Sequence, residues 1–110
     1  MWRLYSGDDG QSHFEELRPP TGPLENSPMQ AATGITFRQS EPGEFIDFHV
    51  APRRQYVITL AGYVEIGLGD GTSKVLGPGD VMLAEDLTGK GHTTRIVGRE
   101  TRLSVAVPLA

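Results

Sequence analysis

The sequence contains no cysteine, and this absence removes several kinds of site at once. Disulfides, thiolate metal centres and cysteine nucleophiles are all excluded. No stretch approaches the ~18 consecutive apolar residues of a membrane span. The N-terminal MWRLYSGDDG also lacks the apolar segment of a signal peptide. We therefore expect a cytoplasmic protein that makes no contact with a membrane.

Positive charge and histidine are both scarce. Ten Lys and Arg residues stand against fourteen Asp and Glu residues, which gives a net charge of -4. Because nucleic-acid binding depends on clustered positive charge, nucleic acid is not an expected partner. The chain has three histidines, His13, His49 and His92, so a site that uses imidazole has few candidates.

Glycine and proline, in contrast, are plentiful. The 110 residues include 14 Gly and 8 Pro, a composition that suits many short strands joined by tight turns. The length is that of one domain with a core of its own. We expect a single domain over residues 1–110, with residues 1–34 forming an N-terminal arm and edge strands and residues 35–110 forming a barrel.

From Gly34 onward the pattern is that of short β-strands separated by Gly-rich and Pro-rich turns. The expected strands cover residues 35–38, 44–50, 55–60, 63–68, 75–76, 81–84, 92–97 and 102–108. Asp70-Gly71 is the dipeptide favoured in two-residue type I′ hairpins. Eight to ten strands at this spacing and no convincing helix predict an all-β protein, an antiparallel jelly-roll barrel that leaves few exposed edges.

The N-terminal part allows two interpretations. Ser12 and Glu15 have the spacing of a helix capping box, but Pro19 and Pro20 limit any helix to about two turns. We prefer an extended edge segment over residues 11–17. Residues 18–34 are expected to form a surface loop. Because the segment 2–17 is apolar in patches and has little of its own to pack against, we also expect a homodimer.

Alternation along the strands predicts which side chains point inward. His49 shares a face with Phe45 and Asp47, and His92 shares a face with Thr94 and Ile96. In the last strand, Leu103, Val105 and Val107 are expected to face the core or the sheet. A polar pair of His92 and Thr94 above an apolar floor is typical of a small-molecule pocket.

Residues 43–62 and 77–92 resemble the two motifs of the small single-domain cupins. The first motif, G-x5-H-x-H-x3/4-E-x6-G, is matched in every spacing by Gly43, His49, Gln55 and Gly62, but Ala51 stands for its second His and Gln55 for its Glu. The second motif is matched by the turn of residues 77–80 and by His92, with Ile96 where an Asn is common. The resemblance implies a cupin-type antiparallel jelly-roll β-barrel.

The resemblance also implies a metal site in the mouth of the barrel. His49, Gln55 and His92 would be the ligands of a divalent ion, Fe, Ni, Mn, Cu or Zn. Because two imidazoles and an amide carry no charge, a further ligand such as His13, Asp47 or Glu85 would be needed for tight binding, and an empty polar pocket is the alternative.

Residues around the pocket suggest further contacts. Gln55, Thr94 and Arg53 are candidates for binding substrate, although Arg53 also suits a solvated turn. In the loop that precedes His92, Lys90 is expected either to pair with Glu85 or Asp86 or to reach the pocket.

Three functions follow from these residues. The first is a small-molecule enzyme assisted by a divalent metal, of the isomerase, cyclase, lyase or dioxygenase kind, with His49 and His92 as catalytic residues. The second is a binding or sensing domain without metal. The third is a metal-free enzyme in which His49 or His92 removes a proton from a carbon next to a carbonyl group, because imidazole titrates near neutrality.

Overall fold

The computed structural model describes residues 1–20, 22–23 and 25–110. Over these residues the chain forms ten β-strands and no helix, as the sequence predicts. The strands are β1 (Trp2–Ser6), β2 (Ser12–Glu16), β3 (Thr36–Ser40), β4 (Phe45–His49), β5 (Gln55–Ala61), β6 (Tyr63–Gly67), β7 (Ser73–Leu76), β8 (Val81–Glu85), β9 (His92–Val97) and β10 (Arg102–Pro108).

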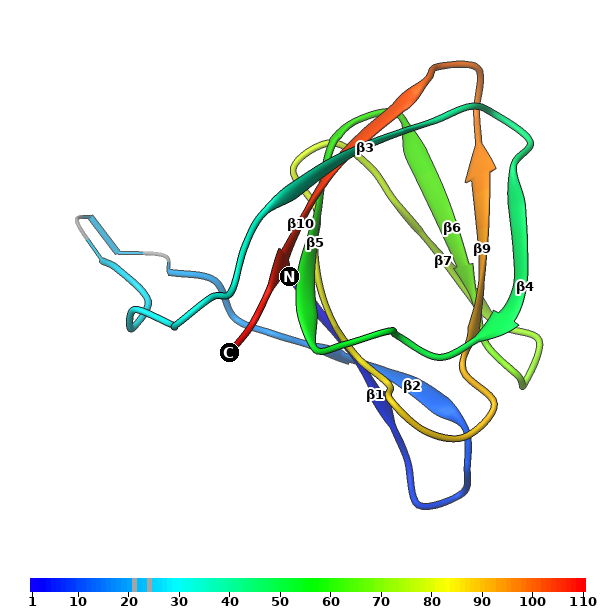
Figure 1. Cartoon of the computed structure of the whole chain (residues 1–110), viewed down its shortest axis with the longest axis horizontal. Helices are drawn as coiled ribbons and strands as arrows, with labels where there is room; N and C mark the ends of the chain where they lie inside the picture. Colours follow the sequence, from blue (N-terminus) through cyan, green and yellow to red (C-terminus); the bar gives the residue numbers. More distant parts are fainter. Residues whose placement is uncertain (21, 24) are drawn as a thin grey trace.

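The strands form two sheets that face each other as a jelly-roll barrel (Figure 1). The six-stranded sheet has the order β2-β1-β8-β5-β10-β3, and the four-stranded sheet has the order β4-β9-β6-β7. Apolar side chains from both sheets and from the β4–β5 loop make the core: Leu4, Ala51, Val64, Ile66, Leu76, Met82, Ala84 and Ile96. The fold class is therefore the one predicted.

One strand pair departs from the expected antiparallel pattern. β1 runs parallel to β8, with Trp2 opposite Met82 and Leu4 opposite Ala84. No hairpin fixes the relative direction of these two strands, because β2 turns back first and β8 comes much later in the chain.

The N-terminal segment is extended, so the preferred interpretation of residues 11–17 is confirmed over β2 and the helical one is wrong. Leu4 is fully buried, and Trp2 and Phe14 pack against the core with their rings edge to face, 6.4 Å between centroids. Since these apolar side chains have partners in their own chain, they no longer argue for a dimer.

Residues 18–34 form the expected loop in their described part, with one isolated bridge between Ala32 and Leu109. Thr21 and Leu24, which the same prediction covered, lie outside the described residues.

The hairpin between β6 and β7 is present, but its turn is not the two-residue type I′ turn expected. Leu68 donates its N–H to the carbonyl of Thr72, and Gly71 donates its N–H to the carbonyl of Leu68. Gly71 has a φ of 88°. This is the three-residue loop in which a turn is followed by a left-handed Gly, and Asp70 stabilises it by accepting the N–H and the hydroxyl of Thr72.

The inward face of β10 is the opposite of the one predicted. Arg102, Ser104 and Ala106 line the interior, whereas Leu103 is 38% exposed. Val105 is buried, but it lies on the strand face opposite Arg102 and Ser104. Because the interior is partly polar, alternation alone identifies two faces without saying which one is inside.

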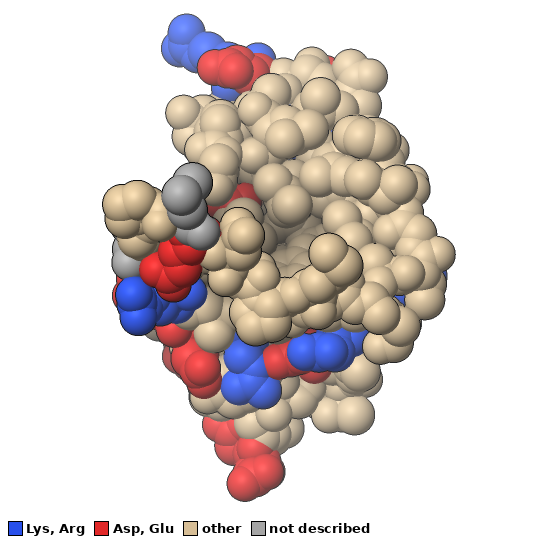
Figure 2. All heavy atoms as spheres, turned by 90° about the vertical axis from the view of Figure 1, so that its left-hand side faces the viewer, with Lys and Arg blue, Asp and Glu red and all other residues tan. Residues whose placement is uncertain are grey.

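Within the described part of the chain there is no helix that could cross a membrane. Figure 2 shows the face that carries the loop of residues 18–34: charged side chains of both signs lie mostly toward its edges, and the hollow near its centre is surrounded mainly by uncharged residues.

Candidate functional site

A cavity of about 440 Å³ lies between the two sheets. Its wall includes the main residues that the sequence predicted for the site: His49, Arg53, Gln55, His92 and Thr94. They come from β4, the β4–β5 loop, β5 and β9, so the fold joins segments that are far apart in the sequence.

The two imidazoles face each other across adjacent strands. β4 and β9 are antiparallel with His49 opposite His92, and the ring centroids are 4.5 Å apart with an angle of 56° between the planes. The prediction that these rings meet in one cavity is confirmed.

The reason given for the inward direction of His49 was wrong. Phe45 is 45% exposed instead of buried, and the residue of β4 that shares the cavity with His49 is Ile46. Residues three apart cannot lie on one face of a regular strand, but the register between β4 and β9 shifts between Ile46 and His49. This irregularity, of the β-bulge type, turns His49 into the cavity.

Gly91 allows the close approach of the two strand ends. Its φ is 79°, and a Cβ there would overlap the carbonyl oxygen of His49. A side chain at residue 91 would therefore push His49 away from His92, so this position requires glycine for space as well as for conformation.

His92 is held by a buried carboxylate. Its Nδ1 lies 2.6 Å from Oδ2 of Asp86, and the same oxygen accepts the hydroxyl of Ser12 at 2.6 Å. Asp86, Ser12 and His92 are all buried, with Asp86 at 0% exposure. The other carboxylate oxygen, Oδ1, has no hydrogen-bond partner among the described residues.

His49 is oriented in a similar way by the backbone. Its Nδ1 donates to the carbonyl of Asp47 at 2.8 Å. In both rings the Nδ1–H is therefore engaged, and among the described residues neither Nε2 has a hydrogen-bond partner. Each neutral ring then carries its lone pair on Nε2, which is the nitrogen available to a molecule in the cavity.

The residues present fit only a weak metal site, because two ligand positions of the motif that this chain resembles are altered: Ala51 replaces the second His and Gln55 replaces the Glu. Ala51, in the place of the second His, is buried and offers no ligand atom. Throughout the described residues, no group of three or more His, Asp or Glu side chains is placed to hold a metal ion. The donors that remain are two neutral imidazoles and the amide of Gln55.

The additional ligands suggested by the sequence lie elsewhere. His13 contacts Asp9 at 2.9 Å, and Asp47 accepts the backbone N–H of Phe48 through its side chain. Glu85 pairs with Arg3 and Arg54. None of the three suggested residues lines the cavity.

The expectations for Lys90 were also wrong. Its ammonium group lies 4.4 Å above the centre of the Phe48 ring, a cation–π contact, and neither Glu85 nor Asp86 pairs with it among the described residues.

Burial by itself raises the pKa of Glu85, but the hydrogen bonds from Arg3 and Arg54 outweigh it and lower the pKa below its ordinary value. Glu85 thus fastens β1 and the β4–β5 loop to the end of β8.

Sequence reasoning missed two arginines in the cavity wall, Arg38 on β3 and Arg102 on β10. Arg102 is 7% exposed, and its one hydrogen bond within the described residues goes from Nη2 to Oγ1 of Thr59 at 2.9 Å. The sequence did contain a signal, because Arg102 and Ser104 place polar residues on alternate positions of a strand whose other face is apolar.

Comparison with known proteins supports the fold. No family model matches the sequence, and no curated protein matches it. A conserved uncharacterised protein with a double-stranded β-helix domain from Klebsiella pneumoniae is similar with a TM-score of 0.54 at 23% identity, over 82% of this chain and 83% of that one.

Two further solved structures are similar at the same level. The polyketide cyclase RemF from Streptomyces resistomycificus has a TM-score of 0.54 at 18% identity, over 96% of this chain and 72% of that one. A conserved protein of unknown function from Streptococcus pyogenes has a TM-score of 0.54 at 21% identity, over 74% of this chain and 68% of that one. At identities this low, the structural similarity establishes the double-stranded β-helix fold, which is the fold of a small cupin domain. It does not establish the activity.

Proposed function

We propose that this cupin-fold domain binds a small carbonyl compound in the barrel cavity and that His49 and His92 transfer protons on it as an acid–base pair. The observation that carries the proposal is the geometry of the two rings. Their centroids are 4.5 Å apart, both line the cavity, and the hydrogen bonds at Nδ1 leave both Nε2 atoms to the bound molecule.

The chemistry follows from these two nitrogens. The Nε2 lone pair of one ring removes a proton from the carbon next to the carbonyl group, and the other ring, in its protonated form, donates a proton to the carbonyl oxygen. We assign the role of base to His92, because the carboxylate of Asp86 accepts its Nδ1–H and would stabilise the positive charge that develops on the ring as it takes the proton. Isomerisation, cyclisation and elimination can all begin with this step.

Proton exchange tests the proposal without knowledge of the natural substrate. A panel of small ketones, keto acids and aldehydes is incubated with the protein in D₂O, and loss of the α-proton signal is followed by NMR. We expect accelerated exchange for at least one compound, with the rate reduced on the order of 10²-fold or more in His92→Gln and His49→Gln. Exchange that is equal in the wild type and both variants would contradict the proposal.

A divalent ion bound by His49 and His92, with the carbonyl oxygen of Gln55 as a third donor, is the second candidate. It is favoured by the same hydrogen bonds, because metal-binding histidines usually donate their other N–H to a carboxylate or a carbonyl group. The ion would supply Lewis-acid chemistry at the carbonyl oxygen of a bound substrate.

Elemental analysis separates the two candidates. Protein purified without added metal is analysed for Fe, Mn, Ni, Cu and Zn, and Zn²⁺ and Mn²⁺ are titrated into the chelator-treated protein. The acid–base proposal expects proton exchange to survive chelation. Stoichiometric metal that disappears in His49→Ala and His92→Ala, together with loss of exchange on chelation, would favour the metal site.

A further inference from the structure

We propose that Arg38 and Arg102 form an anion-binding subsite in the same cavity, so that the molecule bound beside the imidazole pair carries a carboxylate or a phosphate group. The inference rests on the proposed function for its place in a reaction, but the binding of an anion can be observed independently of any proton transfer.

The burial of Arg102 is the main argument. Arg102 is 7% exposed as a residue, and burying a charged guanidinium group is costly unless an anion or several hydrogen bonds compensate for the lost hydration. Arg102 makes one hydrogen bond, to Thr59, and its buried Nε–H has no partner among the described residues. No carboxylate of the described residues pairs with it. An orphaned charged donor in the wall of a cavity is what a site for an anionic ligand requires.

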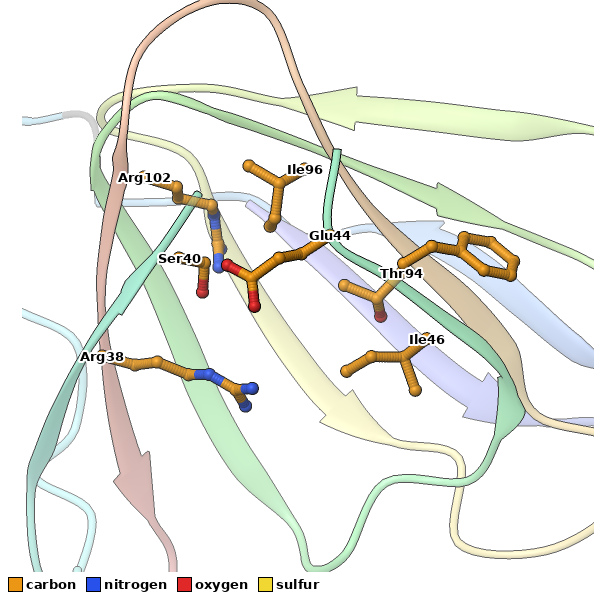
Figure 3. Close-up of a pocket in the computed structure, with 8 residues that line it drawn as sticks. Arg38, Ser40, Glu44, Ile46, Thr94, Ile96 and Arg102 are labelled. Carbon is orange, nitrogen blue, oxygen red and sulfur yellow. The ribbon is translucent and has the colours of Figure 1, made fainter. Parts of the chain in front are cut away.

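Arg38 supplies a second guanidinium group to the same space. Figure 3 shows Arg38 from β3 and Arg102 from β10 extending toward the space that Thr94 and Ile46 face from the other sheet. These four residues line both the main cavity and an adjoining cavity of about 190 Å³. Burial and the charge of Arg38 lower the pKa of Arg102 to about 10, so an anion between the two groups would relieve an unfavourable environment.

Glu44 is a carboxylate that could take the place of the anionic ligand, because it lines the adjoining cavity together with both arginines. Its carboxylate, however, accepts the backbone N–H of Glu41 and forms no ion pair with either arginine within the described residues. The two guanidinium groups therefore keep most of their donors for a ligand, and their planar geometry matches the paired oxygens of a carboxylate or phosphate.

The position of the arginines relative to the histidines limits the ligand. All four side chains line one cavity of about 440 Å³, which is of the size that holds a small organic molecule. The anionic group would be held at the β3–β10 side while the reacting carbon lies at the β4–β9 side, next to His49 and His92. The ligand class is thus a small carboxylic acid or phosphate ester with a second functional group.

The test measures binding of succinate and of inorganic phosphate to ¹⁵N-labelled protein by NMR at constant ionic strength, with sodium chloride and neutral succinamide as controls for salt and for shape. The variants are Arg38→Gln and Arg102→Gln, and Arg99→Gln serves as the matched control, because Arg99 is exposed and lines neither cavity. The Nε–H signal of Arg102 reports directly on the subsite.

We expect at least one of the two anions to bind and to shift the Arg102 Nε–H signal, with at least tenfold weaker binding in Arg38→Gln and no change in Arg99→Gln. Preference for succinate or for phosphate identifies the anionic group. If Arg102→Gln does not fold, the exposed Arg38 and the Arg102 signal still decide. Equal binding in Arg38→Gln and the wild type, binding of succinamide as tight as that of succinate, or no anion binding at all would overturn the inference.

The result is distinguishable from the fate of the proposed function. Anion binding that persists in His92→Gln while no carbonyl compound exchanges its α-proton would leave the subsite standing and remove the acid–base proposal. Histidine-dependent exchange on neutral ketones, without binding of either anion, would support the acid–base proposal and overturn the anion subsite.

Discussion

Asp86 holds the ring of His92 through a 2.6 Å hydrogen bond between Oδ2 and Nδ1, at a place where both side chains are buried. Asp86 follows β8 and His92 begins β9, so this hydrogen bond joins the first residue after β8 to the first residue of β9 across the loop between them. A buried carboxylate that contacts an imidazole fixes which ring nitrogen carries the proton, and it stabilises the ring when a second proton arrives.

Asp86→Asn should therefore reduce the proposed proton exchange much more than it changes the fold. The amide keeps the size of the carboxylate but removes the charge, so the proton-exchange rate should fall on the order of 10²-fold or more. Ser12→Ala is the control, since it removes the other hydrogen bond to Oδ2 and leaves the charge in place. The ¹⁵N shifts of the His92 ring report its tautomer. Equal losses of exchange in both variants would show that Asp86 acts only through packing.

Gly91→Ala should separate the two imidazoles. A Cβ at residue 91 overlaps the carbonyl oxygen of His49, whereas a Cβ at Gly71 meets nothing within 4 Å. Both glycines have positive φ, 79° and 88°, so Gly71→Ala reproduces the backbone strain of about 1 kcal/mol without the overlap. We expect both variants to lose stability in urea denaturation, and only Gly91→Ala to lose proton exchange and to alter the ring signals of His49. Unchanged His49 signals in Gly91→Ala would contradict this.

The barrel could be predicted from the sequence because its signals are local. Turn residues at regular spacing and alternating apolar positions give the number of strands and the all-β class. The meeting of His49 and His92 was predicted from the resemblance of residues 43–62 and 77–92 to the two cupin motifs. The resemblance itself implies that the two motifs share one site, so no contact between them had to be derived from the sequence. These parts of the prediction agree with the structure.

The remaining parts depend on long-range contacts. The irregularity of register in β4, which turns His49 inward, is a property of the pairing with β9 and leaves no mark in the alternation of β4 itself. The prediction that Leu103, Val105 and Val107 face the core or the sheet left Arg102 on the opposite face of β10 by alternation alone. Asp86 and Glu85 are adjacent acids with opposite destinations, one in the interior with His92 and one with the arginines of β1 and the β4–β5 loop, and only the folded chain tells them apart.

Glu85 should make the stability of the fold sensitive to acid. Its folded pKa is lowered from the ordinary value of 4.5 by Arg3 and Arg54 against the opposing effect of burial. The unfolded chain then binds this proton more readily than the folded chain, so the contribution of Glu85 is complete above pH 4.5 and is lost as the pH falls through the folded pKa.

Glu85→Gln should accordingly cost about 1–2 kcal/mol at pH 7, and the difference from the wild type should shrink as the pH is lowered below 4.5. Urea denaturation at pH 7, 5, 4 and 3 measures it. Glu100→Gln removes the same charge from an exposed turn and should leave the profile unchanged. A Glu85→Gln penalty that stays constant down to pH 3 would contradict the assignment.

Arg102→Met should stabilise the fold while it removes the anion subsite. Among the described residues no carboxylate pairs with the guanidinium group of Arg102, so the single hydrogen bond to Thr59 does not restore the hydration lost on burial, and methionine of similar length replaces the group with apolar contacts. We expect a gain of about 1–3 kcal/mol in urea denaturation, increased further in Arg102→Met/Thr59→Val, where the hydroxyl left without its donor is also removed. Binding of succinate and phosphate should be lost in both.

A loss of stability in Arg102→Met and in the double variant would mean that the guanidinium group supports the barrel, and the burial of Arg102 would then no longer argue for a ligand. A gain in stability together with lost binding is the expected signature of a residue kept for its ligand, because natural proteins retain destabilising groups where a site needs them.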